Sequence, residues 1–285
     1  MYRISPFCPI FFAPTKDKYG VKSRYIQTFA PSDKILFEVV ASITDVAPAF
    51  GYKNLITGNE LSHNLKSWQV GEDRILYWGI ISGLEDGLYK VLFDGKESEP
   101  FYITKNEKIL SDTVLIQYSM IDNLQRTDTV FWIDDVQHFF DFRAPGGFKD
   151  DNWSFGVENE QFITPEHDAL EVFGFETTTN SFTLGHNLGC PVWFAELLNR
   201  ILCCHYVYFD GVRYTRHESS TPEMNIEVEG VRSYIFTQAL QRVRFLDPTI
   251  EETNQFRIRR IVDDIYRSVQ LGENSKNLII NNYDE

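Results

Sequence analysis

The stretch PVWFAELLNRILCC followed by HYVYFDGVRYTR, residues 191–216, decides the fold, because it joins an amphipathic helix to a tight hairpin. Pro191 suits the first position of a helix, where its missing N–H would have no partner in any case. The two-residue turn Asp210-Gly211 between Tyr- and Val-rich runs is typical of a β-hairpin. At about 100° per residue the apolar side chains fill a broad arc of the helix, and they are Trp193, Phe194, Ala195, Leu197, Leu198, Ile201, Leu202 and Cys204. We therefore expect a helix over residues 191–204 that is covered by strands on most of its circumference.

The amino-terminal half is expected to be a small antiparallel sandwich. Residues 1–22 contain prolines and aromatics without a clear period, which fits either an extended arm or a first edge strand. Residues 23–110 carry short apolar runs separated by turn-forming residues such as Asp94-Gly95, a pattern typical of an immunoglobulin-like β-sandwich. The polar run from Lys105 to Asp112 predicts a linker, with the domain boundary near Leu110.

Residues 111–248 are expected to form a second β domain, a sandwich or barrel flanked by the helix at 191–204. A hairpin is predicted to turn at Asp134-Asp135 and to end at Pro145-Gly146-Gly147, because these residue types favour turns. Residues 149–171 are rich in carboxylates and predict an acidic, loop-rich surface. Residues 249–285 predict a C-terminal extension that is partly flexible, in which residues 255–271 fit both a helix and a strand. The predicted fold class is mainly β, with two domains and one helix.

The formal net charge of −14 arises from 41 acidic and 27 basic side chains. Nucleic acids and anionic membranes bind surfaces on which Lys and Arg are clustered, so we expect neither as a direct partner of this acidic chain. No apolar run approaches the roughly 18 residues of a membrane helix, and prolines interrupt the apolar amino terminus, which makes it a poor secretion signal. The cysteines show no metal-ligand spacing, which predicts reduced thiols and synthesis in the cytoplasm; they are Cys8, Cys190, Cys203 and Cys204.

The most metal-like cluster consists of Asp134, Asp135, His138 and Asp141. Side chains alternate faces along a strand, so Asp135 and Asp141 share one face while Asp134 and His138 share the other. Ligands divided between two faces suit a metal ion poorly. The sequence therefore predicts solvated turn acids and no metal site.

The residues give little support to catalysis. Cys203, Cys204 and His205 adjoin in sequence, but consecutive side chains point apart, which leaves the thiols without a facing base. The sequence contains no Gly-x-Ser-x-Gly motif and no phosphate-cradling glycine loop. Glycoside hydrolysis needs two carboxylates at a defined separation, and the acids available for it, without a flanking motif, are Asp150, Asp151, Glu158 and Glu160. We expect a protein that is not an enzyme and that holds no cofactor.

Three stretches carry a resemblance to a known class of protein: SRYIQTFAPSDKILFEV (23–39), QYSMIDNLQRTDTVFWIDDVQHFFDFRAPGGFKDDNWSFGVENEQF (117–162) and LGCPVWFAELLNRILCCHYVYFDGVRYTR (188–216). They resemble uncharacterised tail- or baseplate-type structural proteins of phages and prophages of gut Bacteroidetes. The resemblance implies a virion protein that is made in the bacterial host cytoplasm. It also implies β-sandwiches flanked by one helix, as in tail-tube and distal-tail proteins, and partners that are copies of the chain and other virion proteins.

The implied mechanism is assembly into a ring or multi-subunit assembly through heterologous contacts, with strand edges or arms adding across the seam. We hypothesise a charge pairing at this seam between Asp150, Asp151, Glu158 and Glu160 of one subunit and Arg242, Arg244, Arg257, Arg259 and Arg260 of the next. Both groups also fit ordinary solvated faces, because surface charges usually contribute little. Two other classes stay open: a protein that binds a host surface glycan, for example through Trp153, and a tail enzyme that degrades glycans.

Overall fold

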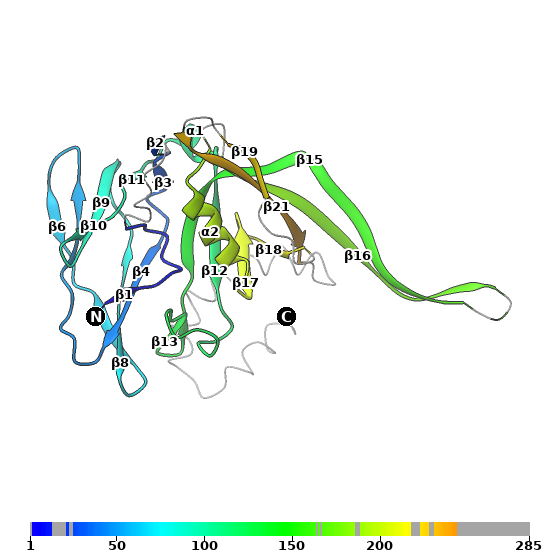
Figure 1. The fold of residues 1–285 in the computed structure, drawn as a ribbon, viewed down its shortest axis with the longest axis horizontal. Helices are drawn as coiled ribbons and strands as arrows, with labels where there is room; N and C mark the ends of the chain where they lie inside the picture. The colour runs from blue at the N-terminus through cyan, green and yellow to red at the C-terminus, as the bar shows by residue number, and fades with distance from the viewer. Residues whose placement is uncertain are drawn as a thin grey trace, which may run out of the picture.

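The computed structural model describes residues 2–12, 21–22, 25–163, 165, 167–185, 189–217, 223–227 and 231–243. Within them the protein is mainly β, as predicted. The predicted extension at residues 249–285 lies outside the described residues. Figure 1 shows, from left to right, the sheets of the amino-terminal half, a helix-flanked second half, and a long hairpin that projects away from both.

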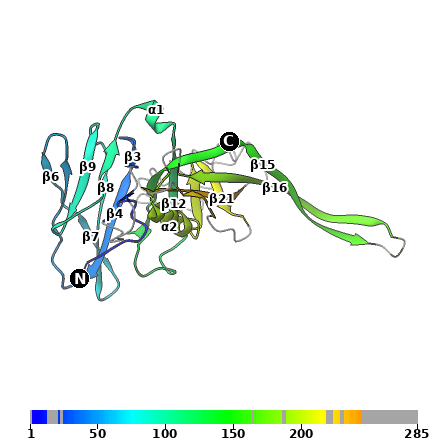
Figure 2. The same cartoon turned by 45° about the horizontal axis from the view of Figure 1, so that its top comes forward.

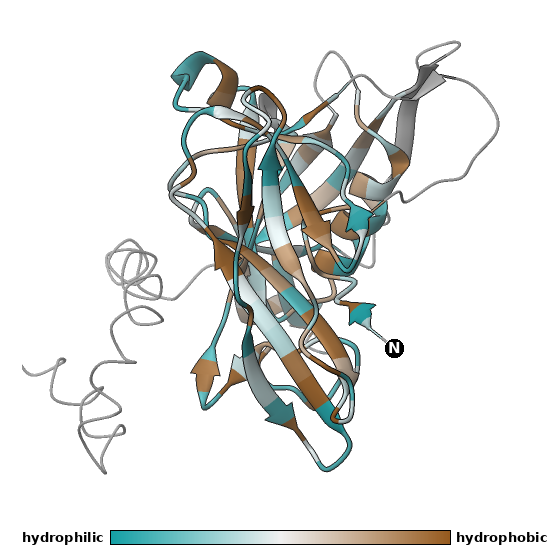
Figure 3. Cartoon of the chain, turned by 90° about the vertical axis from the view of Figure 1, so that its left-hand side faces the viewer, coloured by the Kyte–Doolittle hydropathy of each residue, from teal (hydrophilic) through white to brown (hydrophobic). Residues whose placement is uncertain are grey.

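Two sheets of the amino-terminal half face each other and enclose one apolar core. Phe37 of the first sheet stacks on Phe50 of the second, with ring centroids 4.7 Å apart. Figure 3 shows hydrophilic and hydrophobic residues alternating along strands of this half, as predicted for a half-buried sheet. The first sheet has the order β1 (Arg3–Ile4), β4 (Ile35–Ser42), β8 (Arg74–Ile81), β7 (Lys66–Val70). The second has the order β3 (Gln27–Phe29), β11 (Phe101–Ile103), β9 (Gly87–Phe93), β5 (Phe50–Asn54), β6 (Glu60–Ser62), with β10 (Lys96–Glu97) beside β9.

Strand β4 is buried on both of its faces. Phe37 and Val39 point into the sandwich. Leu36, Glu38 and Val40 on the other face are also buried, because the second half of the chain covers them. The outer face of β4 is therefore an internal surface of the molecule.

The second half contains a closed ring of six antiparallel strands. Each strand pairs with the next in the order β12-β15-β16-β21-β18-β17, and β17 pairs back to β12. β19 (Glu223–Glu227) adds to β21 beside β18. The bounds are β12 (Thr113–Ser119), β15 (Phe140–Ile163), β16 (Ala169–Leu184), β17 (Tyr206–Phe209), β18 (Val212–Arg216) and β21 (Tyr234–Arg242). Two short pairs complete the described strands: β13 (Trp132–Ile133) with β14 (Val136–Gln137), and β2 (Val21–Lys22) with β20 (Val231–Arg232).

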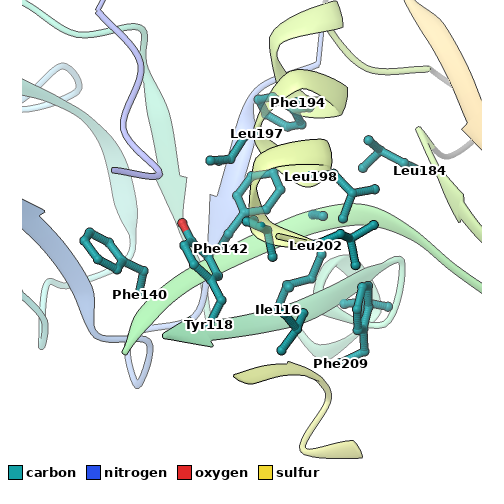
Figure 4. Close-up of a cluster of buried hydrophobic side chains, with 14 of the residues drawn as sticks. Ile116, Tyr118, Phe140, Phe142, Leu184, Phe194, Leu197, Leu198, Leu202 and Phe209 are labelled. Atoms are coloured by element: carbon teal, nitrogen blue, oxygen red, sulfur yellow. The ribbon is translucent and has the colours of Figure 1, made fainter. Parts of the chain in front are cut away.

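Helix α2 spans Val192–Ile201, within the predicted range, and Pro191 is its N-cap. Its apolar side packs on the strands of the barrel (Figure 4), where the rings of Phe194 and Phe142 lie 5.4 Å apart and Leu198 is fully buried. A leucine buried in this way contributes about 2 kcal/mol through the hydrophobic effect. The predicted hairpin after the helix is confirmed, since β17 and β18 are joined by Asp210-Gly211 with positive φ at both residues.

Buried contacts join the two halves. Asp33 accepts hydrogen bonds from the Arg143 guanidinium at 2.7 and 2.8 Å. The amino-terminal segment lies at the same junction: β1 is an edge strand beside β4, and the carbonyl of buried Phe7 accepts a hydrogen bond from the Tyr118 hydroxyl. Because a buried charge that loses its partner is costly, the ion pair favours one arrangement of the halves.

Two local predictions are wrong. Pro145-Gly146-Gly147 does not end a strand, because β15 continues through these residues to Ile163. Residues 149–171, predicted to be loop-rich, form most of the paired outer part of a long hairpin. Gly146 adopts a φ of +120°, a conformation that glycine tolerates and that lets the strand bend and continue. The predicted linker also contains one helical turn, α1 (Glu107–Leu110).

Candidate functional site: a projecting hairpin arm

The arm is the outer part of the β15–β16 hairpin, residues 153–163 and 169–180. It leaves the barrel where the neighbouring strands stop pairing, since β12 reaches β15 only as far as Pro145 and β21 reaches β16 only as far as Thr179. Beyond these points the two strands pair only with each other among the described strands. Figures 1 and 2 show from two directions that the arm extends away from the rest of the molecule.

One face of the arm combines aromatic rings with carboxylates. Directly opposed residues of an antiparallel pair lie on the same face, and the register places Glu158 opposite Phe175 and Glu160 opposite Phe173. The two phenyl rings lie 5.5 Å apart. The next pair along the hairpin, Phe162 and Leu170, extends the row. We call these six residues the acidic-aromatic face, and its apolar members are 40 to 58% exposed.

The opposite face is also apolar in part. Phe155, Val157 and Ile163 are 76, 63 and 65% exposed. Glu176 lies opposite Val157, and the carboxylate of Glu171 accepts a hydrogen bond from Asn159 at 3.4 Å. Neither face of the arm is therefore an ordinary polar surface.

Such a ribbon is incomplete by itself. An isolated two-stranded hairpin is marginally stable in water, and contiguous exposed apolar side chains mark interaction sites in folded proteins. The outer edges of the two strands also present backbone N–H and C=O groups that favour pairing with another chain. The arm therefore has the geometry of a segment that another molecule covers.

The arm is also anionic. The sequence contains no Lys or Arg between Asp150 and Gly185. The arm therefore carries carboxylates without lysine or arginine beside them in the chain. A partner surface for the arm has to combine apolar side chains with hydrogen-bond donors or positive charge.

The structure places part of the predicted interface on this arm. Glu158 and Glu160 are exposed there, two residues apart on one strand, whereas the side chains of Asp150 and Asp151 lie outside the described residues. Arg242 is half-buried at the end of β21, next to the base of the arm. Arg244, Arg257, Arg259 and Arg260 lie outside the described residues. The same geometry puts the two glutamates on a projecting strand and not in a cleft, which is where an acid pair for glycoside hydrolysis would act.

The residues of the metal-like cluster have separate surroundings. Asp134-Asp135 forms the predicted tight turn, with φ of 54° and 60°. His138 packs against Trp78 with ring centroids 4.8 Å apart, and burial lowers the pKa of this imidazole to about 4. Asp141 accepts a hydrogen bond from the N–H of Lys34 at 2.8 Å. Among the residues that the structure describes, no group of three or more His, Cys, Asp or Glu is arranged to hold a metal ion.

The cysteines near the end of α2 differ in exposure. Cys203 is exposed, and its thiol donates to the carbonyl of Asn199 at 3.5 Å. Cys204 is half-buried, and burial raises the pKa of its thiol to about 12. The Nδ1 atom of His205 lies 3.4 Å from the sulfur of Met120. The imidazole contact is thus with a thioether, and this arrangement does not activate either thiol.

Three of the tryptophans pack into the body of the protein. Trp68, Trp78 and Trp132 are half-buried and pack against the apolar cores. The side chain of Trp153, the residue expected to be exposed, lies outside what the structure describes. The exposed aromatic rings of the arm were not predicted to form a binding surface.

No family model, curated protein or solved structure matches this chain. Within the described ranges, no helix is long and apolar enough to span a membrane. Function is therefore inferred from the arm and from the body that carries it.

Proposed function

We propose that this protein is a non-enzymatic structural component of a phage virion, in the tail, baseplate or connector. It assembles with copies of itself into a ring or another multi-subunit assembly. The observation that carries the proposal is the arm, whose exposed apolar side chains on both faces mark a surface that another chain covers. The resemblance of the sequence to tail- and baseplate-type proteins supplies the virion context.

The position of the arm supports a head-to-tail contact. Two arms placed face to face would oppose Glu158 and Glu160 with identical carboxylates, and like charges opposed on a sheet are destabilising. An arm that binds a different surface of the neighbour avoids this repulsion. Contacts between two different surfaces generate rings when the rotation closes.

The charge seam is part of the proposal. Glu158 and Glu160 stand on the arm, and the basic side comprises Arg242 and the arginines at 244, 257, 259 and 260 of a neighbouring subunit. An assembly held in this way weakens as ionic strength rises, because salt screens exposed charges. Further partners would be other virion proteins.

The proposal includes the architecture of the two halves. We infer that residues 23–110 form an immunoglobulin-like module and that the boundary to the second domain lies near Leu110. The two facing sheets and their single enclosed core support this assignment. The barrel with its one flanking helix supports the comparison with tail-tube and distal-tail proteins at the level of architecture alone.

The test is the mass of the full chain in solution, measured by light scattering over a range of concentrations and salt. The informative variant lacks residues 156–177, which are replaced by Asn-Gly. Phe155 and Thr178 are directly paired, so a two-residue turn joins them without changing the register. We expect the full chain to form a defined oligomer and the shortened chain to remain a folded monomer.

The outcomes separate the possibilities. A full chain that stays monomeric at every concentration contradicts the proposed function. An oligomer that survives loss of the arm contradicts the role of the arm while leaving self-assembly in place. Circular dichroism of the shortened variant shows whether its body is folded, which makes its mass interpretable.

A further inference from the structure

A small pocket lies where the amino-terminal segment, the second sheet and the start of α2 meet. Its volume is about 100 Å³. A cavity of about 150 Å³ lined by apolar side chains holds a benzene molecule, so this pocket has room for part of one apolar side chain. The walls are mostly aromatic and apolar: Ile10, Phe11, Tyr25, Pro100, Trp193 and Phe194.

The pocket also offers hydrogen-bond donors. Gln27 lines it and is 6% exposed, and the Nε2 atom of this side chain is buried without a hydrogen-bond partner among the described residues. A buried amide donor without an acceptor is costly, at about 1 to 3 kcal/mol. An oxygen atom brought by a ligand would remove that cost.

The start of α2 borders the same pocket through Pro191 and Trp193. The helix has no side-chain cap at its N-terminus and no acidic residue in its first turn. The N–H groups of the first turn and the helix dipole favour negative charge at this end. Ile26 and Val192, 41 and 39% exposed, place further apolar surface nearby. Glu99 also lines the pocket, so the apolar walls must supply much of the attraction.

We propose that this pocket receives the acidic-aromatic face of the arm from a second copy of the chain. This inference rests on the proposed self-assembly and replaces the charge seam, since the start of α2, in place of Arg242 and the arginines that follow it, faces Glu158 and Glu160. An aromatic side chain of the arm enters between the apolar walls, an oxygen of the arm accepts a hydrogen bond from Gln27, and the carboxylates of Glu158 and Glu160 lie toward the start of α2.

A second copy is the occupant for two reasons. The arm of the same chain points away from the body (Figures 1 and 2), so it does not fold back onto α2. The chain itself carries both complementary surfaces, with exposed rings and carboxylates on the arm and apolar walls with donors at the pocket. Each copy then gives an arm to one neighbour and a pocket to the other, which is a head-to-tail contact.

The first test changes charge at the pocket without disturbing the fold. In Val192→Glu a carboxylate enters the first turn of α2, where negative charge stabilises the helix, but it repels the arm. We expect about a five- to tenfold rise in the dissociation constant of the assembly, with Val192→Gln as the uncharged control. Glu158→Lys/Glu160→Lys should weaken assembly, whereas Glu171→Lys/Glu176→Lys on the opposite face should do so much less.

The second test is a cross-link between copies. In a Cys203→Ser background, which removes the exposed thiol, one batch carries Glu160→Cys and another carries Val192→Cys. A short bismaleimide should join the two variants when they are mixed. Ser67→Cys, exposed on β7, replaces Val192→Cys in the control mixture and should give little cross-linking.

The results distinguish this contact from the proposed function. An oligomeric chain that shows no cross-link between positions 160 and 192, together with an unchanged mass for Val192→Glu, overturns the docking contact and leaves self-assembly standing. A chain that is monomeric at all concentrations overturns both.

Discussion

Glu38 illustrates how a single residue depends on both halves of the chain. It lies on β4 and is fully buried, because the second half covers that face of the sheet. One carboxyl oxygen accepts a hydrogen bond from the N–H of Val130 at 3.3 Å, and the other has no hydrogen-bond partner among the described residues. Burial raises the pKa of Glu38 well above its ordinary 4.5, so the folded protein holds this side chain in its neutral form.

The raised pKa of Glu38 predicts a pH dependence of stability. The unfolded chain releases this proton near pH 4.5 while the folded chain keeps it, so the contribution of Glu38 to stability is complete below that pH. It is lost as pH rises toward the folded pKa, at up to about 1.4 kcal/mol per pH unit. Glu38→Gln replaces the carboxyl group with an amide that does not titrate, so the variant lacks this pH dependence. We expect its free energy of unfolding relative to wild type to increase from about pH 5 to about pH 8, measured by urea denaturation; a difference that stays constant with pH would count against a neutral Glu38.

At the scale of the element, the conformation of Gly146 lets β15 continue from the barrel into the arm. The strand continues past Pro145-Gly146-Gly147 because Gly146 adopts a left-handed φ of +120°. A Cβ at this position would overlap the carbonyl oxygen of Thr183. The adjacent Gly147 has ordinary space, since a Cβ there would lie 4.0 Å from Val114 Cγ2.

Gly146→Ala should therefore destabilise the protein by about 3 kcal/mol, through backbone strain and a steric clash. Gly147→Ala should change the free energy of unfolding by less than about 1 kcal/mol. Thermal unfolding of the two variants beside wild type measures the difference. Equal effects at the two glycines would show that the bend does not depend on the left-handed conformation.

An element could be predicted from the sequence where neighbouring residues alone determine its conformation. Asp94-Gly95, Asp134-Asp135 and Asp210-Gly211 were all predicted to be turns, and all have positive φ, because such residues tolerate that conformation by themselves. The first strand of the arm was missed because its carboxylates were interpreted as part of a loop-rich surface, although the apolar residues at 153, 155 and 157 alternate with polar or small ones. A run from Trp153 to Ile163 without a proline was the available signal for a strand.

At the scale of the whole molecule, each of the larger sheets lies on one side of the predicted boundary near Leu110, but one buried core contains residues from both sides. Phe7 near the amino terminus and Leu36 of β4 belong to the same buried cluster as the barrel and α2. Contacts between residues more than 100 positions apart, such as Asp33 with Arg143, leave no periodic pattern in a sequence. The strands of each half were predictable for the opposite reason, since each depends on its own turn chemistry and alternation.

The position of Phe7 predicts that the two halves lose stability together. Its ring lies 5.2 Å from that of Phe131 and 6.1 Å from that of Tyr118, and it is fully buried between the halves. Phe7→Ala should cost about 3 to 5 kcal/mol, through lost burial and the cavity that remains. Hydrogen exchange should then accelerate both in β4 of the first half and in β12 of the second, because one shared core protects them. Tyr2→Ala is the matched control: its ring meets Phe93 within the first half, and it should leave the exchange of β12 unchanged. Faster exchange of β4 in Phe7→Ala with β12 still protected would mean that the halves unfold independently.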